Sequence, residues 1–528
     1  MTLLTRRPSH DGVEAEALIK EAKALRRRRR TIGTFVVVVA VALVVALVLA
    51  FGVARPARNP TPSSASRNRP SVDVRAFRNE GRLAFVSRNA IWIVDGRAGV
   101  MKELPTIKGY SPGSPQFSRD GKWLAYLETR TTNDATVSNV WIARGNGTDA
   151  REVARSVGAF TGWSSARDLL TVVSTTPVKF ASGTLYPVPS GVELIAPSGN
   201  VRELVSFPTH GEQSVQVSNA VWSPGGDAVA VSTSSGGRNG GTSVRSYPIA
   251  GGSPTTWFSI RNSAILPGVC TGCGGRDAIA DLAGWWPGWG IGFWVFSSGM
   301  THNNDDTPIE LVTGPRATLH IIGDTLSDGT TVAFSSDPNG ELAIVASTGG
   351  REYGAGKTVD VCRRSTETCE PIPGASVWSS KPLPCVGLEC SQVPAKGTPG
   401  SAVSIDPSWS PNGSLLAYEK APTVPDDGVP NHEWYAAHVL YLWSASTNSS
   451  RKVAVLQGAT VPIWSKNGEE LLYVANNALW LWQVNTAQPL KVASPLLPPR
   501  QWMTAEGEMS YSYYEQVNFH GQFSWWSR

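Results

Sequence analysis

Six cysteines carry the most specific chemistry in the sequence, because they fall into three close pairs. The pairs are Cys270 with Cys273, Cys362 with Cys369, and Cys385 with Cys390. All six follow an uncharged segment that predicts export, and an even number of cysteines in an oxidising compartment favours disulfides. A polar turn separates the second pair, and the third pair closes a short loop. We therefore predict local pairing, with the connectivity left open.

The first pair, Cys270-Thr-Gly-Cys273, also has the spacing of one half of a zinc ribbon. A four-cysteine zinc site needs a second C-x₂-C pair, and the sequence contains none. A thioredoxin-like redox motif would lie within a βαβ unit, and no such pattern surrounds this pair. Zinc and redox chemistry are therefore less favoured than a structural disulfide or free thiols.

Catalytic motifs are few. Gly109-Tyr-Ser-Pro-Gly113 matches the G-x-S-x-G pattern, which needs a strand before the serine and a helix after it. Pro112 and Pro115 follow instead, so we assign this segment to a loop between repeats. The seven histidines are scattered, and the sequence has no G-x-x-x-x-G-K-[ST] loop and no H-E-x-x-H. We predict no catalytic residue and no cofactor, and an enzyme is the less favoured class.

Two polar clusters contain oxygen ligands of the kind that calcium prefers. The candidate ligands are Asp305, Asp306, Asp426 and Asp427. Neither cluster has EF-hand spacing, so we favour solvated loops and predict no metal site. A tryptophan cluster could stack against a sugar, but we favour packing in the core for its members, Trp285, Trp286, Trp289 and Trp294.

An uncharged run over residues 31–54 indicates a membrane segment. About 20 apolar residues in a helix span the roughly 30 Å hydrocarbon core of a bilayer. The run is too long for a cleaved signal peptide, so we predict one transmembrane helix over residues 34–54. Residues 1–33 form a basic, helical segment that includes five consecutive arginines, and the positive-inside rule places it in the cytoplasm. We expect a single-pass protein of a bacterial cytoplasmic membrane, with the C-terminal domain outside.

Residues 55–70 are rich in Pro, Ser and Arg and predict a flexible linker. The formal charge of the whole chain is +5, but residues 1–59 alone have a net charge of +7. Residues 60–528 therefore have a net charge of −2 and no global attraction for nucleic acid. Nucleic acid is excluded as an expected partner of the extracytoplasmic domain, residues 71–528.

The chain beyond residue 70 repeats a short unit. A strand ends in an aromatic residue, an Asp-Gly or Asn-Gly pair favours a tight hairpin turn, and an apolar run forms the next strand. Repeats of about 40–50 residues with four strands each are typical of β-propellers. The eight aromatic anchors, 40 to 75 residues apart, are Phe77, Phe117, Trp163, Trp222, Trp285, Phe334, Trp409 and Trp464.

The W-S-P-D/N-G pattern at Trp409 and its W-S-P-G-G variant at Trp222, together with strands such as Ile-Trp-Ile-Val-Asp at 91–95, resemble the TolB-like, WD40-like (PD40) propeller repeat. The resemblance covers roughly residues 71–495. It implies an all-β fold, a β-propeller of seven or eight four-stranded blades around a central channel, preceded by the transmembrane helix. Residues 522–525 echo Gln116-Phe117-Ser118, so they would close the ring against the first blade.

Propeller ligands usually lie on loops at the channel mouth. We therefore expect a membrane-anchored, non-catalytic binding or scaffold module for a protein, a peptide or a cell-envelope polymer, with residues 34–54 in the lipid bilayer. Two alternatives stay open. One is a propeller enzyme, a lyase or hydrolase with a His, Tyr or metal cluster at the channel. The other is a transmembrane sensor that signals through the N-terminal segment.

Overall fold

The computed structural model describes residues 69–131, 136–179, 185–210, 214–236, 240–262, 278–297, 307–325, 332–335, 340–347, 357–366, 368–375, 402–422, 437–453, 458–484, 486–496, 519 and 521–527. They belong to one compact unit, Asn68–Arg528. The segments predicted over residues 1–33 and 34–54, and nearly all of the linker, lie outside them. Within these ranges no helix is long and apolar enough to cross a membrane.

The described residues form strands and turns, and neighbouring strands pair antiparallel. The first sheet has the order β32-β2-β3-β4 and joins both ends of the unit. Its strands are β2 (Arg82–Ser87), β3 (Ala90–Asp95), β4 (Val100–Glu103) and β32 (Phe523–Trp526).

A seven-stranded sheet follows, and it consists of two four-stranded meanders that share one long strand. The shared strand, β8, pairs with β7 through its first half and with β9 through its second half. The strands are β5 (Ser111–Phe117), β6 (Trp123–Thr131), β7 (Thr136–Arg144), β8 (Arg151–Trp163), β9 (Leu170–Lys179), β10 (Leu185–Ile195) and β11 (Val201–Ser206).

The middle of the chain adds a four-stranded sheet and an eight-stranded one. The former is β12 (Val215–Trp222), β13 (Ala228–Ser235), β14 (Gly241–Pro248) and β15 (Thr255–Arg261). In the latter, a single bridge from β19 to β21 links two meanders. Its strands are β16 (Ala278–Trp286), β17 (Gly290–Ser297), β18 (Thr307–Val312), β19 (Leu319–Thr325), β20 (Val332–Phe334), β21 (Leu342–Ser347), β22 (Lys357–Arg363) and β23 (Thr368–Pro371).

Two more sheets complete the unit. One is β24 (Ala402–Trp409), β25 (Leu415–Pro422), β26 (Val439–Ser444) and β27 (Ser449–Lys452). The other is β28 (Thr460–Trp464), β29 (Glu470–Ala475), β30 (Ala478–Gln483) and β31 (Leu490–Ser494), with β1 (Ser71–Val72) added on the outer edge of β31.

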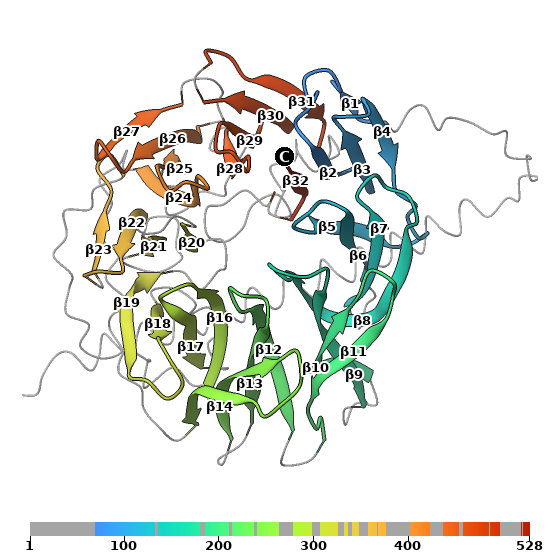
Figure 1. Ribbon diagram of the computed structural model, residues 1–528, viewed down its shortest axis with the longest axis vertical. Coiled ribbons are helices and arrows are strands. Elements are labelled where there is room, and N and C mark those ends of the chain that lie inside the picture. Colours follow the sequence, from blue (N-terminus) through green and yellow to red (C-terminus); the bar gives the residue numbers. More distant parts are fainter. Residues whose placement is uncertain are drawn as a thin grey trace, which may run out of the picture. The chain divides into compact units, whose positions relative to one another are not determined.

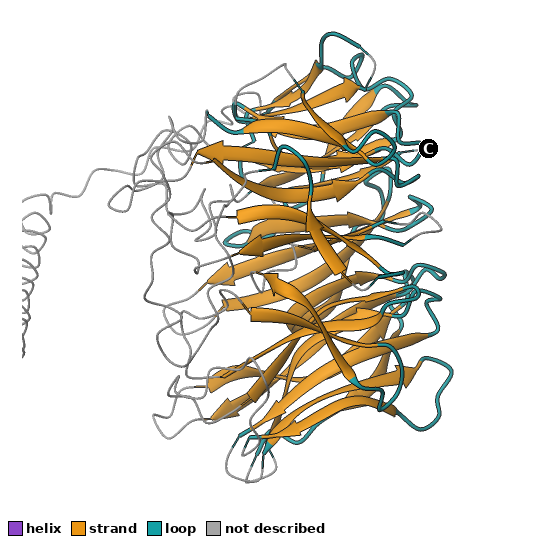
Figure 2. Cartoon of the chain, turned by 90° about the vertical axis from the view of Figure 1, so that its left-hand side faces the viewer, coloured by secondary structure: helices purple, strands orange, loops and turns teal. Residues whose placement is uncertain are grey.

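The sheets follow one another in chain order around a ring, and β32 brings the end of the unit back to β2 (Figure 1). The first strand of each meander is innermost in Figure 1, and Figure 2 shows the sheets from the side. The apolar core lies between successive sheets. For example, Ile91 and Ile93 of β3 pack against Leu124 and Tyr126 of β6. A closed ring of antiparallel meanders is a β-propeller, so the described part of the chain has the fold that the repeats predict.

Hairpin turns between the first two strands of a meander depend on glycine. Gly121 has a φ of 67°, a conformation that glycine adopts without steric cost. A Cβ atom at this position would lie 2.2 Å from the Trp526 ring. The Asp-Gly turn of the second meander therefore fits against the strand that closes the ring.

Indole N–H groups connect successive innermost strands. Trp163 Nε1 donates to the carbonyl oxygen of Gln116 at 2.9 Å, and Trp222 Nε1 donates to that of Gly162 at 3.1 Å. Trp464 Nε1 donates to the carbonyl oxygen of Ser408 at 2.8 Å. Each acceptor residue directly precedes the aromatic anchor of the preceding meander, so the repeat spacing also sets contacts between neighbours.

The N-terminal repeat differs from the assignment made from its sequence. Phe77 lies in a turn before β2, fully buried, and not at the end of an innermost strand. Trp525 stands in the place of the anchor, because it pairs with Leu83 just as Trp464 pairs with Leu471. The reason is topological: the innermost strand of this meander comes from the other end of the unit.

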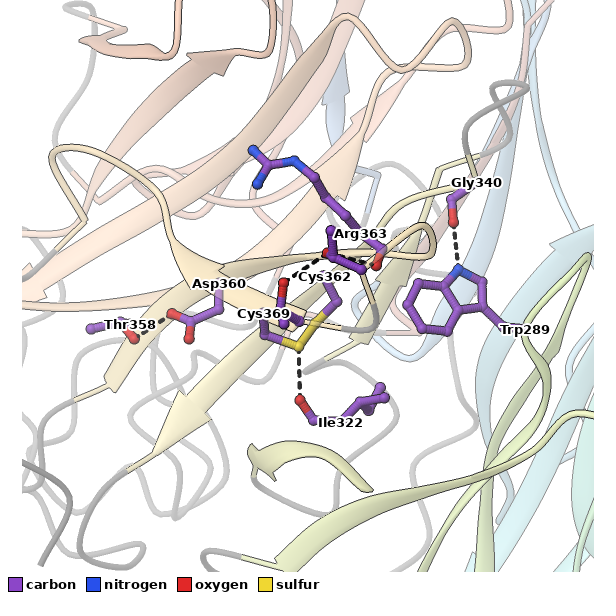
Figure 3. Close-up of a disulfide and its surroundings, with 10 residues drawn as sticks. Trp289, Ile322, Gly340, Thr358, Asp360, Cys362, Arg363 and Cys369 are labelled. Carbon is purple, nitrogen blue, oxygen red and sulfur yellow. Dashed lines mark hydrogen bonds between the residues drawn. A yellow bond between two sulfur atoms is a disulfide. The ribbon is translucent and has the colours of Figure 1, made fainter. Parts of the chain in front are cut away.

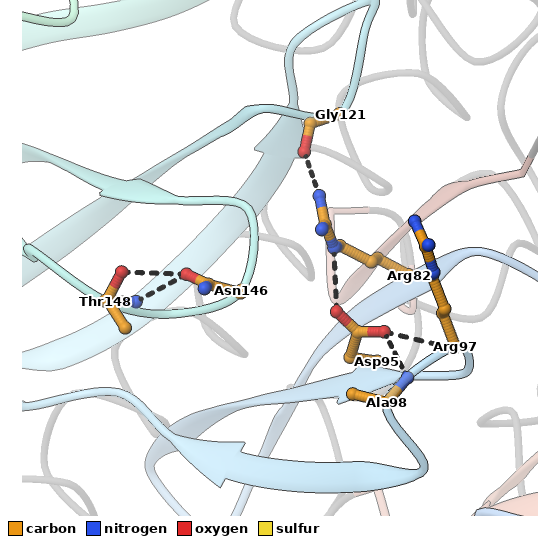
Figure 4. Close-up of polar contacts among 7 residues, drawn as sticks. All are labelled: Arg82, Asp95, Arg97, Ala98, Gly121, Asn146 and Thr148. Carbon is orange, nitrogen blue, oxygen red and sulfur yellow. Dashed lines mark hydrogen bonds and ion pairs between the residues drawn. The ribbon is translucent and has the colours of Figure 1, made fainter.

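An arginine also ties the first sheet to the second (Figure 4). Arg82 Nε donates to Asp95 Oδ2 at 3.1 Å, and Arg82 Nη1 donates to the carbonyl oxygen of Gly121 at 2.8 Å. The guanidinium lies 5.6 Å from the centre of the Trp526 ring. One side chain thus contacts its own sheet, the next hairpin turn and the closing strand.

Candidate functional site

Three innermost strands contain the same irregularity, a residue with positive φ followed by a proline. These pairs are Ser114-Pro115 in β5, Asp406-Pro407 in β24 and Val461-Pro462 in β28, with φ of 50°, 52° and 52° at the first residue. Each lies where the register to the next strand shifts. Proline tolerates such bulges because it has no N–H to donate, and a bulge redirects side chains. A β-branched residue such as Val461 rarely has positive φ, and such strain clusters at ligand sites.

The bulges of β24 and β28 line a cavity of about 300 Å³. All the strands that contribute are the innermost ones of their meanders, so the cavity lies on the inner side of the ring. Among the described residues of the lining, only Asp406 and Ser408 have polar side chains. These described residues are Val332, Asp406, Pro407, Ser408, Val461, Pro462, Ile463, Phe519, Gly521 and Phe523.

Behind Asp406 lie three more buried polar side chains, Glu419 in β25, His438 just before β26, and Thr460 at the start of β28. Asp406 is 3% exposed and the other three are 0% exposed. Thr460 Oγ1 donates to Asp406 Oδ2 at 3.2 Å, and His438 Nδ1 lies 3.2 Å from Glu419 Oε2. The Glu419 carboxyl also shares a hydrogen bond with Asp406. The four residues form a chain from His438 to the cavity wall.

The protonation of this chain follows from its burial. Burial raises the pKa of Glu419 well above its usual value, and the neighbouring Asp406 carboxylate raises it further. Burial lowers the pKa of His438 to about 3. His438 is therefore uncharged at neutral pH, so its contact with Glu419 is a hydrogen bond and not an ion pair.

Metal binding finds no support in the described ranges, where no three His, Cys, Asp or Glu side chains are arranged to hold a metal ion. The calcium candidates Asp305, Asp306, Asp426 and Asp427 lie outside these ranges, so the interpretation of their loops stays a prediction.

One predicted cysteine pair is confirmed. Cys362 and Cys369 face each other on β22 and β23 and form a disulfide (Figure 3). Cys362 is fully buried beside Leu342 and Ile344, so the bridge fastens the outer strands of this meander to its core. The remaining candidates, Cys270, Cys273, Cys385 and Cys390, lie outside the described residues.

The tryptophan cluster contributes to the core. Trp286, Trp289 and Trp294 are 9%, 2% and 1% exposed, and Trp289 Nε1 donates to the carbonyl oxygen of Gly340 in the adjoining meander (Figure 3). Trp285 packs edge-on against Trp257, with ring centres 5.0 Å apart. The arrangement is packing rather than an exposed stacking platform. The assignment of the G-x-S-x-G match to a loop holds only for Gly109 and Tyr110, because Ser111 begins strand β5, which contains Pro112 and Gly113 as well. Another strand, β6, and no helix follows it.

The residues of the cavity wall were not singled out in the sequence. His438 is one of seven scattered histidines, and Asp406, Glu419 and Thr460 lie in unremarkable positions of their strands. These four meet only because β24, β25 and β28 of two neighbouring sheets pack together. One sequence signal does mark the position. In three repeats a proline stands two residues before the aromatic anchor, and in only one of them an acidic residue, Asp406, precedes that proline.

No family model matches the chain, and no curated protein matches it. Among solved structures, the dihydro-heme d1 dehydrogenase NirN is 12% identical with a TM-score of 0.46, covering 83% of this chain and 82% of that one. The β-propeller domain of the Trilobed protease from Pyrococcus furiosus is 7% identical with a TM-score of 0.34, covering 74% and 99%.

A prolyl endopeptidase is 12% identical, with a TM-score of 0.38 and 79% of this chain covered. The chain spans about half of that enzyme's length, with 54% of it covered. None of these similarities is strong enough to carry an argument about activity. The propeller fold of the described residues rests on their own strand pairing, and the similarity to TolB-like repeats stays a resemblance.

Proposed function

We propose that this chain is a membrane-anchored, extracytoplasmic binding module, an eight-bladed propeller that holds part of its ligand in the cavity beside Asp406. The observation that carries the proposal is the cavity itself. An apolar pocket with a few convergent polar groups is the usual form of a ligand site, and this one has a buried carboxylate in its wall. The ligand is a small molecule or a group that projects from a peptide or envelope polymer.

The count of meanders supports eight blades. Four sheets contribute one meander each, and the seven- and eight-stranded sheets contribute two each. The membrane anchor is inferred from the uncharged residues 31–54. Strand β1 begins directly after the linker and pairs with the last meander, which supports residues 55–70 as the connection between anchor and propeller.

A cavity-filling substitution tests the proposal. A fragment library is screened by thermal shift against the full-length chain in nanodiscs, where a ligand of the native state raises Tm. We expect hits that lose their effect in Ser408→Phe, which fills the cavity. The matched control is Ser446→Phe, on an exposed turn of the same sheet. A screen without hits, or hits that S408F leaves unchanged, would contradict the proposal.

Acid–base catalysis is the second candidate, because the chain from His438 through Glu419 to Asp406 has the group types that relay protons. It is less favoured, since Asp406 alone of the three lines the cavity. If the wild-type chain chemically converts a ligand whose binding depends on the cavity, and Asp406→Asn does not convert it, catalysis is favoured over a binding module.

A further inference from the structure

We propose that a basic patch around Tyr110 binds an anionic polymer of the cell envelope through the carboxylate or phosphate groups of that polymer. The patch consists of Tyr110 and three basic side chains near its ring, Lys108, Arg130 and Arg155. It shares no residue with the described lining of the cavity. The inference therefore rests on the extracytoplasmic location proposed above and not on the cavity.

The sheets have two ends, which use their polar groups differently. The turn end, on the right in Figure 2, has the turns between the first and second strands and between the third and fourth strands. The connection end, opposite to it, has the hairpins between the second and third strands and the connections between successive meanders.

Contacts between meanders occupy polar groups of the turn end. Trp526 Nε1 donates to the carbonyl oxygen of Arg119 at 3.2 Å. Arg119 Nη1 in turn donates to the carbonyl oxygen of Ser165 at 2.6 Å. Ser165 Oγ donates to the carbonyl oxygen of Pro224 at 2.8 Å. This end therefore uses polar groups to hold neighbouring meanders together.

Basic side chains at the turn end of the second meander also have acidic partners. Lys122 Nζ lies 2.6 Å from Asp120 Oδ2. Arg144 Nε lies 2.6 Å from Asp149 Oδ2. The positive charges at this end are therefore compensated within the meander.

Tyr110 is the centre of the patch at the connection end. It lies in the connection from β4 to β5, and its carbonyl oxygen accepts a hydrogen bond from Asn89 Nδ2 at 3.3 Å. The Arg130 guanidinium, on β6, lies 5.3 Å from the centre of the Tyr110 ring. Arg155, on β8, interacts electrostatically with the Tyr110 hydroxyl, and Lys108 precedes Tyr110 by two residues. Three basic side chains from three segments thus converge on one ring.

The positive charge of the patch faces solvent. Lys108 and Arg130 are exposed, and the Arg155 side chain is 80% exposed. Arg155 pairs with Glu152, but within the described part of the chain no acidic group pairs with Lys108 or Arg130. Like charges held close together repel one another, so an anion bound among them is stabilised.

The exposure of the patch favours a polymer over a small anion. Ion pairs in water are individually weak and are screened by salt. A small anion contacts few of the basic groups, whereas a polymer with a negative charge on each repeat contacts several at once and gains from multivalency. Residues 60–528 have a net charge of −2, so the attraction is local to the patch.

Two polymers of known charge test the patch. Alginate carries carboxylates and polyphosphate carries phosphates, and each is titrated onto the full-length chain in nanodiscs of zwitterionic lipid. We expect the wild type to bind at least one of them, and the double variant Lys108→Gln, Arg130→Gln to bind it roughly fivefold more weakly or worse. Lys108→Arg, Arg130→Lys keeps both charges and should bind like the wild type. High salt should reduce the difference between wild type and K108Q/R130Q.

The matched control is Arg97→Gln, Arg167→Gln, which removes two exposed arginines from the turn end. The basic segment at residues 1–33 is the same in all variants, so it cannot cause a difference between them. Equal binding by wild type and K108Q/R130Q, or an equal loss in the control, overturns the inference.

A lipid ligand is the remaining alternative, and vesicles of phosphatidylglycerol distinguish it. If K108Q/R130Q loses binding to these vesicles but keeps its binding to both polymers, the patch binds lipid and the inference is wrong. A fragment screen without cavity-dependent hits contradicts the proposed cavity site and leaves the polymer measurement unchanged, so the two proposals fail separately.

Discussion

Glu310 in β18 shows how strongly burial acts on a single carboxyl. The side chain is 0% exposed, and neither carboxyl oxygen has a hydrogen-bond partner. Burial raises the pKa of Glu310 from 4.5 to about 8, because the charged form loses its hydration and gains nothing in return. Glu310 does not line the cavity, so we expect the free-energy cost of ionising its buried carboxyl to lower the stability of the fold alone.

A pH-dependent stability follows from this shift. Because the folded-state pKa is raised, the stability contributed by the neutral form is complete below about pH 4.5 and is lost as the pH rises through about 8. We expect Glu310→Gln to change Tm little at pH 5 and to raise it at pH 9, by the equivalent of about 1–3 kcal/mol. Thermal melts at both pH values measure this, with Glu103→Gln, an exposed acid on β4, as the control. Equal effects of E310Q at both pH values would refute the explanation.

At the scale of elements, the ring is closed by two strands of unequal importance. Strand β32 is the innermost strand of the first sheet, with Phe523 buried and Trp525 Nε1 donating to the carbonyl oxygen of Glu80. Strand β1 has two residues, lies on an outer edge and leaves Ser71 exposed. The inner closure by β32 therefore buries more apolar area than the outer closure by β1.

Breaking each closure separately should show this difference. A chain truncated after Gly521 loses β32, and we expect the free energy of unfolding to fall by at least about 4 kcal/mol, since the three aromatic side chains of that strand no longer contribute burial. Val72→Pro, which disturbs only the pairing of β1 with β31, should cost about 1 kcal/mol or less. Chemical denaturation of both variants gives the two values. A larger loss in V72P would mean that the outer closure holds the ring.

The hairpins are the elements that the sequence predicts best. An aromatic residue, an Asn-Gly or Asp-Gly pair and an apolar run are local features, and they position the turns at Gly121, Gly413 and Gly468, all with positive φ. At Gly226, which also has positive φ, a Gly-Gly pair takes the place of that pair. The first repeat differs because its innermost strand, residues 523–526, is far away in the sequence from the strand with which it pairs, residues 82–85.

At the scale of the whole molecule, the propeller forms a site from strands that no single repeat contains. The cavity takes residues from β20, β24, β28 and the closing segment, which lie between residues 332 and 523. If the predicted anchor is present, this site faces the exterior on a domain tied to the membrane through residues 55–70.

Membrane attachment is testable in the full chain. Wild-type protein should remain with the membrane fraction after a high-salt or alkaline wash. The double variant Leu43→Arg, Leu47→Arg should be released, since each arginine at the centre of a transmembrane helix costs roughly 2.5–3.5 kcal/mol. The control is Leu18→Arg, in the predicted cytoplasmic segment. Release of the wild-type chain by the same wash would refute the anchor.

The sequence by itself determined the features that depend on neighbouring residues. Hairpin turns, aromatic anchors and the Cys362–Cys369 bridge follow from short-range patterns, because each pairs residues a few positions apart. The echo between residues 116–118 and 522–524 also predicted the closing strand. These features were enough to predict an all-β ring of repeats.

Only the tertiary structure decided where the site lies. Asp406, Glu419 and Thr460 belong to different strands, His438 lies just before a fourth, and their types are ordinary for exposed positions. Their chemistry changes because two neighbouring sheets pack around them and exclude water, which raises the pKa of Glu419 and lowers that of His438. Desolvation depends on the surrounding atoms of distant segments, and for that reason no local pattern in the sequence encodes it.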